Sequence, residues 1–267
     1  KVLVSRLLKL NYKVTVMSRD EEKHYWMKEE YSGNKNITFK IGDIRNYNSV
    51  SDALNGKDIV VNCAAMKQVP ISEYNPMEAV WTNVIGAGNI VSAVKEHNYS
   101  IDTIVSISSD KACKPFSVMG MTKALSERII ISGNKLSSKT RFICLRCGNF
   151  VSSSGSVMEL FNKQIKDGGP VTITHPDMVR FFVSLDEVCD MFFTALKEAS
   201  SGDIYVANVK KIKILDLAKQ MIGGLNVKIK FIGVRPGEKL CEELISEYEQ
   251  PYCIKRGKYT VITSLLK

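Results

Sequence analysis

Short apolar runs alternate with longer stretches of helical spacing through the first half of the chain. Runs of strand type occupy residues 1–4, 14–17, 37–41, 59–63, 103–107 and 141–145. The stretches between them repeat apolar side chains at helical intervals, at residues 5–11, 50–54, 76–97 and 122–132. Strands that alternate with helices predict an α/β fold with a doubly wound parallel sheet.

The pattern changes after Asn149. Glycine and serine dominate residues 152–156. A helix is predicted to follow them and to end near residue 166, and further helices are predicted over residues 185–199 and from residue 215 onward. Residues 170–174 and 204–206 have strand character. We therefore expect an α/β core at residues 1–153, to which 181–209 return, and a smaller α/β cap formed mainly by 154–267. Ligands of such sheets bind at the carboxyl ends of the strands, so the cleft should lie between core and cap.

A sheet that binds a dinucleotide needs a glycine-rich turn after its first strand. Here residues 1–4 run directly into the predicted helix at 5–11, and no glycine occurs before Gly33. Either the protein lacks this turn or the turn is left out of the numbered chain. We expect omission, because a strand cannot reverse into a packed helix without connecting residues.

Composition restricts the class of protein. With 45% hydrophobic and 24% charged residues, the 267-residue chain is an ordinary globular protein. The net charge of +9 comes from scattered lysines, so small phosphorylated ligands are favoured over nucleic acid. No apolar run reaches the roughly 20 residues of a membrane span, and Arg6 interrupts the first run too early for a signal peptide, so a cytoplasmic location is expected.

The seven cysteines form no disulfide pattern. Cys144 and Cys147 make a CxxC inside a run that reads as a buried strand, with no second pair and no nearby histidine. We therefore expect reduced thiols and no metal site.

Nine motifs occur in an order that is similar to one enzyme family. They are GDIR (42–45), AAMKQVP (64–70), EYNP (73–76), SSDKA (108–112), MGMTK (119–123), GN (148–149), GSV (155–157), RF (180–181) and RPGEK (235–239). Together they resemble the UDP-N-acetylglucosamine 4,6-dehydratases of bacterial capsule, flagellin-sugar and glycan synthesis, in the extended short-chain dehydrogenase/reductase superfamily. The resemblance implies a Rossmann-like sheet with a substrate cap, and a homo-oligomer, either hexamer or dimer.

The resemblance also implies a reaction. NADP takes a hydride from C4 of the hexose, water leaves across C5–C6, and the hydride returns to C6, with either retention or inversion at C5. Two other functions stay open: a nucleotide-sugar 4-epimerase or reductase, and a catalytically silent nucleotide-sugar-binding relative.

The sharpest motif is Ser109-Asp110-Lys111. By the resemblance, Ser109 hydrogen-bonds the C4 oxygen, Asp110 protonates the departing C6 hydroxyl, and Lys111 removes the C5 proton. An adjacent acid and base in a closed cleft suit these steps. Without the other motifs, a surface turn with a local ion pair would be the preferred interpretation.

Met119 and Lys123 occupy the two ends of the superfamily's Tyr-x-x-x-Lys. Lys123 is expected to bind the nicotinamide ribose from the same helix face. Methionine accepts no proton, so either the proton step at C4 has moved to another group or the protein is inactive. We favour activity, with Lys111, or Asp110 through a water, as the base at C4.

The cofactor residues implied by the resemblance follow successive strands. Arg19, beside Ser18 and Asp20, would pair with a 2′-phosphate and favour NADP over NAD, assisted by Lys23. Asp43 with Ile44 would meet the adenine, although an aspartate there is equally common as a turn residue. The small residues Cys63, Ala64 and Ala65 would allow close approach of the cofactor, and Lys67 would contact cofactor or substrate.

The substrate residues implied by the resemblance lie mostly in the cap. Asn149 and Val157 match positions at the sugar and uridine. Thr174 and Arg180 would face the diphosphate-sugar, and Arg235 with Glu238 would hold phosphate and ribose.

Overall fold

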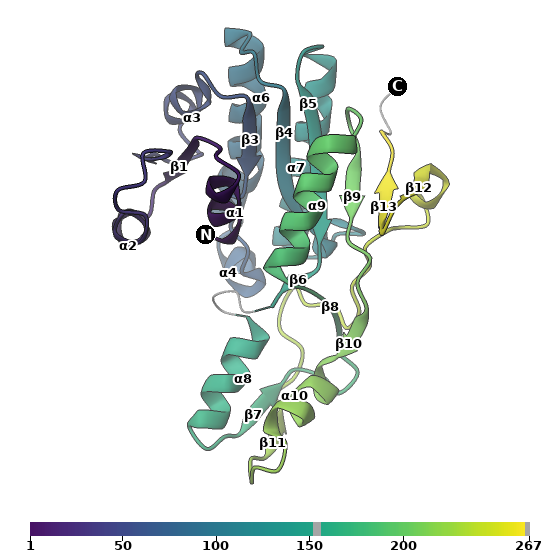
Figure 1. Cartoon of the computed structure of the whole chain (residues 1–267). Coiled ribbons are helices and arrows are strands. Elements are labelled where there is room, and N and C mark those ends of the chain that lie inside the picture. The colour runs from purple at the N-terminus through teal and green to yellow at the C-terminus, as the bar shows by residue number, and fades with distance from the viewer. Residues whose placement is uncertain (152–155, 265–267) are drawn as a thin grey trace.

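The computed structural model describes residues 1–151 and 156–264. They form a large lobe built on a parallel sheet and a smaller lobe at one end of it (Figure 1). The predicted boundary between residues 153 and 154 lies outside the described residues, and the division into two domains stays a prediction.

The large sheet has six strands in the order β12-β13-β9-β5-β4-β3. Four strands are mutually parallel: β3 (Ile59–Asn62), β4 (Thr103–Ser109), β5 (Arg141–Cys147) and β9 (Ile204–Val206). The hairpin of β12 (Cys253–Arg256) and β13 (Tyr259–Ile262) adds an antiparallel edge on β9. The predicted α/β fold with a parallel sheet is confirmed. The sequence pattern did not place this C-terminal hairpin in the large sheet.

The predicted strand over residues 1–4 is wrong. Residues 2–9 form helix α1 (Val2–Lys9) because Leu3 and Leu7, one turn apart, pack on the core beside α9 (Leu185–Glu198). β1 (Val14–Ser18) and β2 (Ile37–Ile41) consequently pair in a separate parallel ribbon. Within the described residues, no strand joins this ribbon to β3.

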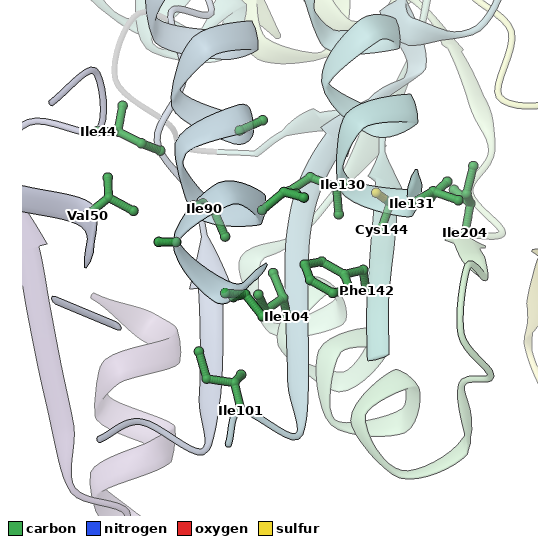
Figure 2. Close-up of a cluster of buried hydrophobic side chains, with 14 of the residues drawn as sticks. Ile44, Val50, Ile90, Ile101, Ile104, Ile130, Ile131, Phe142, Cys144 and Ile204 are labelled. Atoms are coloured by element: carbon green, nitrogen blue, oxygen red, sulfur yellow. The ribbon is translucent and has the colours of Figure 1, made fainter. Parts of the chain in front are cut away.

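Helices cover both faces of the large sheet because successive side chains of its strands point in opposite directions. Ile104 and Phe142 pack against α6 (Gly86–His97) and α7 (Val118–Ser132), whereas Val105 and Ile143 pack beneath α9. Figure 2 shows the first of these clusters, with Ile90, Ile130 and Ile131 facing the strands. Helix α3 (Tyr47–Leu54) extends it through Val50 and Leu54.

The helix predicted over residues 76–97 is interrupted. It begins as α5 (Pro76–Ala79), widens into a π-helical turn (Val80–Ile85) and continues as α6. Two helices that precede it in the chain are α2 (Glu21–Glu30) and α4 (Val69–Tyr74). None of the helices in the described part of the chain has the length and apolar character of a membrane span.

The smaller lobe has its own core. α8 (Val157–Lys166) and α10 (Ile214–Ile222) pack on the parallel pair β7 (Val171–Ile173) and β11 (Ile229–Phe231). A short sheet of β6 (Asn149–Phe150), β8 (Val179–Val183) and β10 (Lys211–Lys213) connects the lobes. This lobe lies within the residues for which the sequence predicted a smaller α/β cap.

Candidate active site

A cavity of about 510 Å³ lies where the carboxyl ends of the central strands meet the smaller lobe. Most of the predicted catalytic and substrate residues line it: Ser109, Lys111, Met119, Lys123, Asn149, Val157, Thr174, Arg180, Arg235 and Glu238, together with Cys63, Ala65 and Lys67. The structure therefore brings together motifs that lie far apart in the sequence. The remaining predicted residues lie behind the cavity or after the ends of β1, β2 and β3.

Lys111 lies at the centre of this cavity wall, in a 3₁₀ turn (Asp110–Ala112) that follows β4. Its Nζ is 3.0 Å from Asp110 Oδ1, 3.1 Å from Asn149 Oδ1 and 3.7 Å from Glu242 Oε1. All three neighbours are acceptors. A side chain surrounded by oxygen acceptors is matched by the three donors of an ammonium group.

Asp110 has no exposed surface and does not line the cavity. Its Oδ1 accepts hydrogen bonds from Ser109 Oγ at 2.9 Å and from Lys111 Nζ, whereas Oδ2 accepts none among the described residues. Any proton from Asp110 would therefore reach a ligand through Ser109 or Lys111.

Helix α7 carries Met119 and Lys123 on the face that borders the cavity. Both side chains are buried, and Lys123 Nζ donates to the Ile107 carbonyl at 2.6 Å. Burial lowers the pKa of Lys123. Met119, on the same face of α7, has a thioether side chain and therefore no titratable group.

Two residues inside the motifs position α7, although the sequence pattern assigned them no role. A side chain on Gly120 would place its Cβ 2.5 Å from the Lys111 carbonyl oxygen, so glycine allows α7 to approach the 3₁₀ turn that carries Lys111. Glu73 Oε1 accepts from the backbone amide of Val118 at 2.7 Å and so holds the start of the helix. A negative charge at a helix N-terminus is stabilising.

Asn83 is a third residue that sequence reasoning missed. It is buried in the π-helical turn, and its amide donates to Thr122 Oγ1 at 2.9 Å and to the Met66 carbonyl at 3.0 Å. Its Oδ1 accepts from the Met66 amide at 2.8 Å. Asn83 thus connects the loop after β3 to α7. A lone amide within an apolar helical run was the available signal.

The ends of β1 and β2 carry the residues predicted for the adenosine end of a cofactor. Ser18 Oγ accepts from the Asp20 amide at 3.1 Å, and Asp20 caps α2 by accepting from the Lys23 amide at 3.0 Å. Hydrogen bonding to Lys23, whose ammonium also pairs with this carboxylate, lowers the pKa of Asp20. The Arg19 side chain is 62% exposed and available to a phosphate.

Asp43 is committed to intramolecular contacts. Arg45 Nε and Nη2 donate to its Oδ2 at 3.0 and 2.7 Å, and this hydrogen bonding lowers the pKa of Asp43. Arg19 Nη1 lies 3.5 Å from the same oxygen. The Ile44 side chain is buried in the core against Gly86, so only its backbone remains for a ligand.

The strand end after β3 is open. Cys63, Ala64 and Ala65 are exposed directly after the buried Asn62. Small side chains there give access to the main chain, as a bound dinucleotide requires. Lys67 is also exposed at this edge.

The smaller lobe contributes the other predicted residues. Arg180 is buried and donates to the Val179 and Leu240 carbonyls at 2.8 and 3.2 Å, while Thr174 Oγ1 lies 3.1 Å from Met178 Sδ. Arg235 Nη2 pairs with Glu238 Oε1 at 2.7 Å.

Metal ligands do not gather in the described residues. No group of three histidine, cysteine, aspartate or glutamate side chains is arranged there to hold an ion. Cys144 and Cys147 are buried in β5, where the sequence predicted a core strand.

The parallel sheet, the helices on both its faces and the cavity at its carboxyl edge define a Rossmann-like α/β protein. Within that class, the chain belongs to the polysaccharide biosynthesis protein family, whose sequence pattern matches residues 1–264.

Relatives of the chain carry two kinds of description. It is 40% identical over 266 residues to a UDP-glucose 4-epimerase of Rickettsia prowazekii, covering 96% of this chain and 77% of the relative. It is 41% identical over 261 residues to an uncharacterized membrane protein of Methanocaldococcus jannaschii, covering 93% and 78% of the two chains.

Solved structures confirm the fold. Pen from Bacillus thuringiensis superimposes with a TM-score of 0.94 at 37% identity, over 99% of this chain and 84% of that one. A dTDP-glucose 4,6-dehydratase from Streptomyces venezuelae with bound NAD reaches a TM-score of 0.81 at 19% identity, over 92% and 85% of the two chains, and shares the fold.

Proposed function

We propose that the chain is an NADP-dependent UDP-N-acetylglucosamine 4,6-dehydratase of bacterial surface-polysaccharide biosynthesis. The family assignment and the described relatives support an enzyme that acts on nucleotide sugars. The observation that carries the finer proposal is Lys111, which is presented to the cavity between Asp110 and Asn149. A charged amine beside Ser109 suits the loss of water next to a new ketone.

Bound NADP would supply the hydride acceptor for C4 and the donor for C6. Ser109 lies at the end of β4 in the cavity wall, where its hydroxyl would hydrogen-bond the C4 oxygen. Lys123, held on the Ile107 carbonyl beside the cavity, would bind the nicotinamide ribose. Because Asp110 is sealed off, Lys111 is the member of that pair that would meet the sugar.

The residues fit NADP at the adenosine end. The exposed Arg19 guanidinium and the Lys23 ammonium follow the carboxyl end of β1, and Asp20, the carboxylate next to Arg19, is engaged as a helix cap and as the partner of Lys23. A 2′-phosphate would therefore meet two cations. NAD-type specificity would instead need Asp20 to accept from the ribose.

A 4-epimerase is the second candidate, and the description of the Rickettsia relatives favours it. An epimerase returns the hydride to C4 and needs a base for the C4 hydroxyl only. Met119 removes the usual phenol from that position, while the Asp110–Lys111 pair provides more proton chemistry than epimerisation requires. A catalytically inactive protein that binds a nucleotide sugar is the third candidate.

The deciding experiment is incubation with UDP-N-acetylglucosamine and NADP in deuterated water, followed by mass spectrometry and NMR. A dehydratase gives a 4-keto-6-deoxy product that has lost one water and carries one deuterium at C5, and the C5 signal shows retention or inversion. An epimerase gives an isomer of unchanged mass. Unchanged substrate with cofactor bound supports the silent binder.

A cytoplasmic location and a homo-oligomer, hexamer or dimer, are parts of this proposal that follow from the family resemblance. Light scattering of the purified protein measures the second. A monomer at micromolar concentration contradicts it.

A further inference from the structure

Lys239 ends the RPGEK motif (235–239), and neither the motifs nor the proposed reaction assigns it a role. It does not line the cavity, although three other residues of the motif do. Its Nζ donates instead to two consecutive backbone carbonyls, that of Cys113 at 3.2 Å and that of Lys114. These two residues directly follow the 3₁₀ turn that carries Lys111.

The backbone that receives these hydrogen bonds needs support from its surroundings. Lys114 has a φ of +44°, in the left-handed region that residues other than glycine rarely adopt. Such a conformation persists only where neighbouring structure holds it. The pairs of the Lys114 ammonium with Glu243 and Glu247 are partly exposed, so they restrain the backbone weakly. The contacts of Lys239, whose side chain is only 22% exposed, are better shielded from water.

The loop that carries Lys239 is anchored on both sides of it. Before it, Gly237 lies so close to Glu73 that an added Cβ would be 2.7 Å from Glu73 Oε1. After it, the Leu240 carbonyl accepts from the Val179 amide at 2.9 Å. Because these contacts already hold the loop, the Lys239 ammonium is left to hold the backbone beside the 3₁₀ turn.

Lys239 and Lys111 also share a charged neighbour. Glu242 is buried, with one carboxylate oxygen 3.7 Å from Lys111 Nζ and the other 3.7 Å from Lys239 Nζ. Two cations therefore balance this carboxylate from its two sides. Without the Lys239 charge, Glu242 would be attracted to Lys111 alone, so the position of the Lys111 amine also depends on Lys239.

We infer that Lys239 is a positioning residue, which fixes the backbone after Lys111 and so keeps the Lys111 amine in place for proton transfer. Lys111 keeps the role that the family resemblance gives it, removal of the C5 proton. A base must lie within hydrogen-bond reach of the proton that it removes. A displacement of about 1 Å is enough to slow such a step on the order of 10²-fold. This inference rests on the proposed dehydratase function.

The placement of Lys239 has a further consequence for the site. Arg235, four residues earlier in the same loop, is predicted to hold the phosphate of the substrate. The loop that binds the nucleotide part of the substrate thus also positions the base that acts on the sugar.

The test is Lys239→Met in the full chain, which keeps an unbranched side chain and removes the ammonium. We expect kcat for dehydration to fall on the order of 10–100-fold. KM for UDP-N-acetylglucosamine should change by less than about threefold, because the groups that bind the substrate remain. Lys230→Met removes an exposed lysine of β11 and serves as the matched control, with turnover within about twofold of the unchanged protein.

A double-mutant cycle separates positioning from general damage to the fold. A Lys111→Ala protein has no amine to position, so adding Lys239→Met should slow its residual turnover by less than about twofold. Two independent effects would multiply instead. If Lys239→Met does not fold, Lys239→Gln, which keeps an amide donor, replaces it in both measurements with a smaller expected loss.

Three results would overturn the inference. They are a Lys239 variant that dehydrates at the rate of the unchanged protein, a rise in KM with kcat unchanged, and effects of Lys239 and Lys111 changes that multiply. The second result would mean that Lys239 holds only the substrate loop. Failure of the unchanged protein to release water from UDP-N-acetylglucosamine would instead overturn the proposed function.

Discussion

Two clusters in the molecule each place one cation between two buried carboxylates. In the first, Arg146 lies between Glu127 and Glu249 beneath the large sheet, and all five of its N–H groups donate hydrogen bonds, of 2.7 to 3.1 Å. In the second, Lys111 lies between Asp110 and Glu242 at the cavity, and the contact to Glu242 is 3.7 Å.

The difference lies in how completely the polar groups are satisfied. A fully hydrogen-bonded network fixes one arrangement and contributes to stability, whereas incomplete satisfaction leaves donors and acceptors for a ligand. In the Lys111 cluster, one oxygen each of Asp110 and Glu242 accepts no hydrogen bond in the described part of the protein. We therefore expect changes to the Arg146 cluster to act on folding and changes to the Lys111 cluster to act on turnover.

The largest effect should follow Lys111→Ala. Loss of the amine removes the proton-transferring group from the cavity, so turnover should fall on the order of 10³–10⁴-fold, and the thermal midpoint should drop because the buried Asp110 and Glu242 lose a partner. Product formation from UDP-N-acetylglucosamine measures the first and calorimetry the second. Lys114→Ala, a nearby surface cation paired with Glu247, should retain turnover.

Arg146→Met tests the other cluster. Two buried carboxylates would lose their partner, which should cost about 3–5 kcal/mol of unfolding free energy. Denaturant unfolding measures the loss. Lys40→Ala breaks the exposed pair with Asp52 and should cost less than about 1 kcal/mol. Equal costs for the two variants would contradict the structural role of the Arg146 cluster.

Acid should weaken the Arg146 cluster in a defined range. Burial alone would raise the pKa of Glu249, but hydrogen bonds and the charge of Arg146 lower it from 4.5 to about 2. Because the folded value lies below the unfolded one, this contribution is complete above pH 4.5 and is lost as pH falls toward 2. Unfolding free energies measured across this range should fall less steeply in Glu249→Gln.

Arg19→Ala should have a smaller effect, limited to cofactor choice. Loss of a charge-assisted hydrogen bond of about 1.5–3 kcal/mol should weaken NADP binding on the order of 10–100-fold and leave NAD binding unchanged. Calorimetric titration with each dinucleotide measures both. Lys28→Ala removes an exposed cation from α2 and serves as the control. Equal weakening of NADP and NAD binding would argue against a 2′-phosphate contact.

The smallest effect should follow Met119→Ala. Met119 has no proton to exchange, so turnover should stay within about tenfold of the unchanged protein, a loss that reflects packing. Steady-state kinetics on folded protein measures it. If Met119→Ala were as damaging as Lys111→Ala, the proton chemistry would not be confined to the Lys111 cluster.

The sequence predicted those strands and helices whose type is determined by residues close together in the chain. The runs rich in β-branched residues at the positions of β1, β3 and β4 predict strands, because strands of a covered parallel sheet are typically made of such runs. Residues 1–4 were ambiguous, because a four-residue apolar run suits a strand or the first turn of an amphipathic helix equally. The apolar run around Asn83 suits a continuous α-helix, so the local pattern did not predict that this segment is a π-helical turn.

The candidate site also has features that the sequence predicted and features that it did not. The sequence motifs predicted one shared site for Ser109, Lys111 and Lys123, and all three residues line the cavity. They did not reveal that Asp110 is sealed behind its neighbours or that Glu242 comes from the cap to face Lys111. Both facts depend on contacts between segments far apart in the chain, which spacing does not encode.

Gly120 has a consequence for sequence variation. Its missing side chain lets α7 lie against the Lys111 carbonyl, whereas the next residue, Met121, is 53% exposed. In a library randomised at both positions and selected for activity, position 120 should return glycine alone and position 121 a broad range of residues. Adjacent codons would thus evolve under opposite constraints, one set by a backbone contact and the other by solvent.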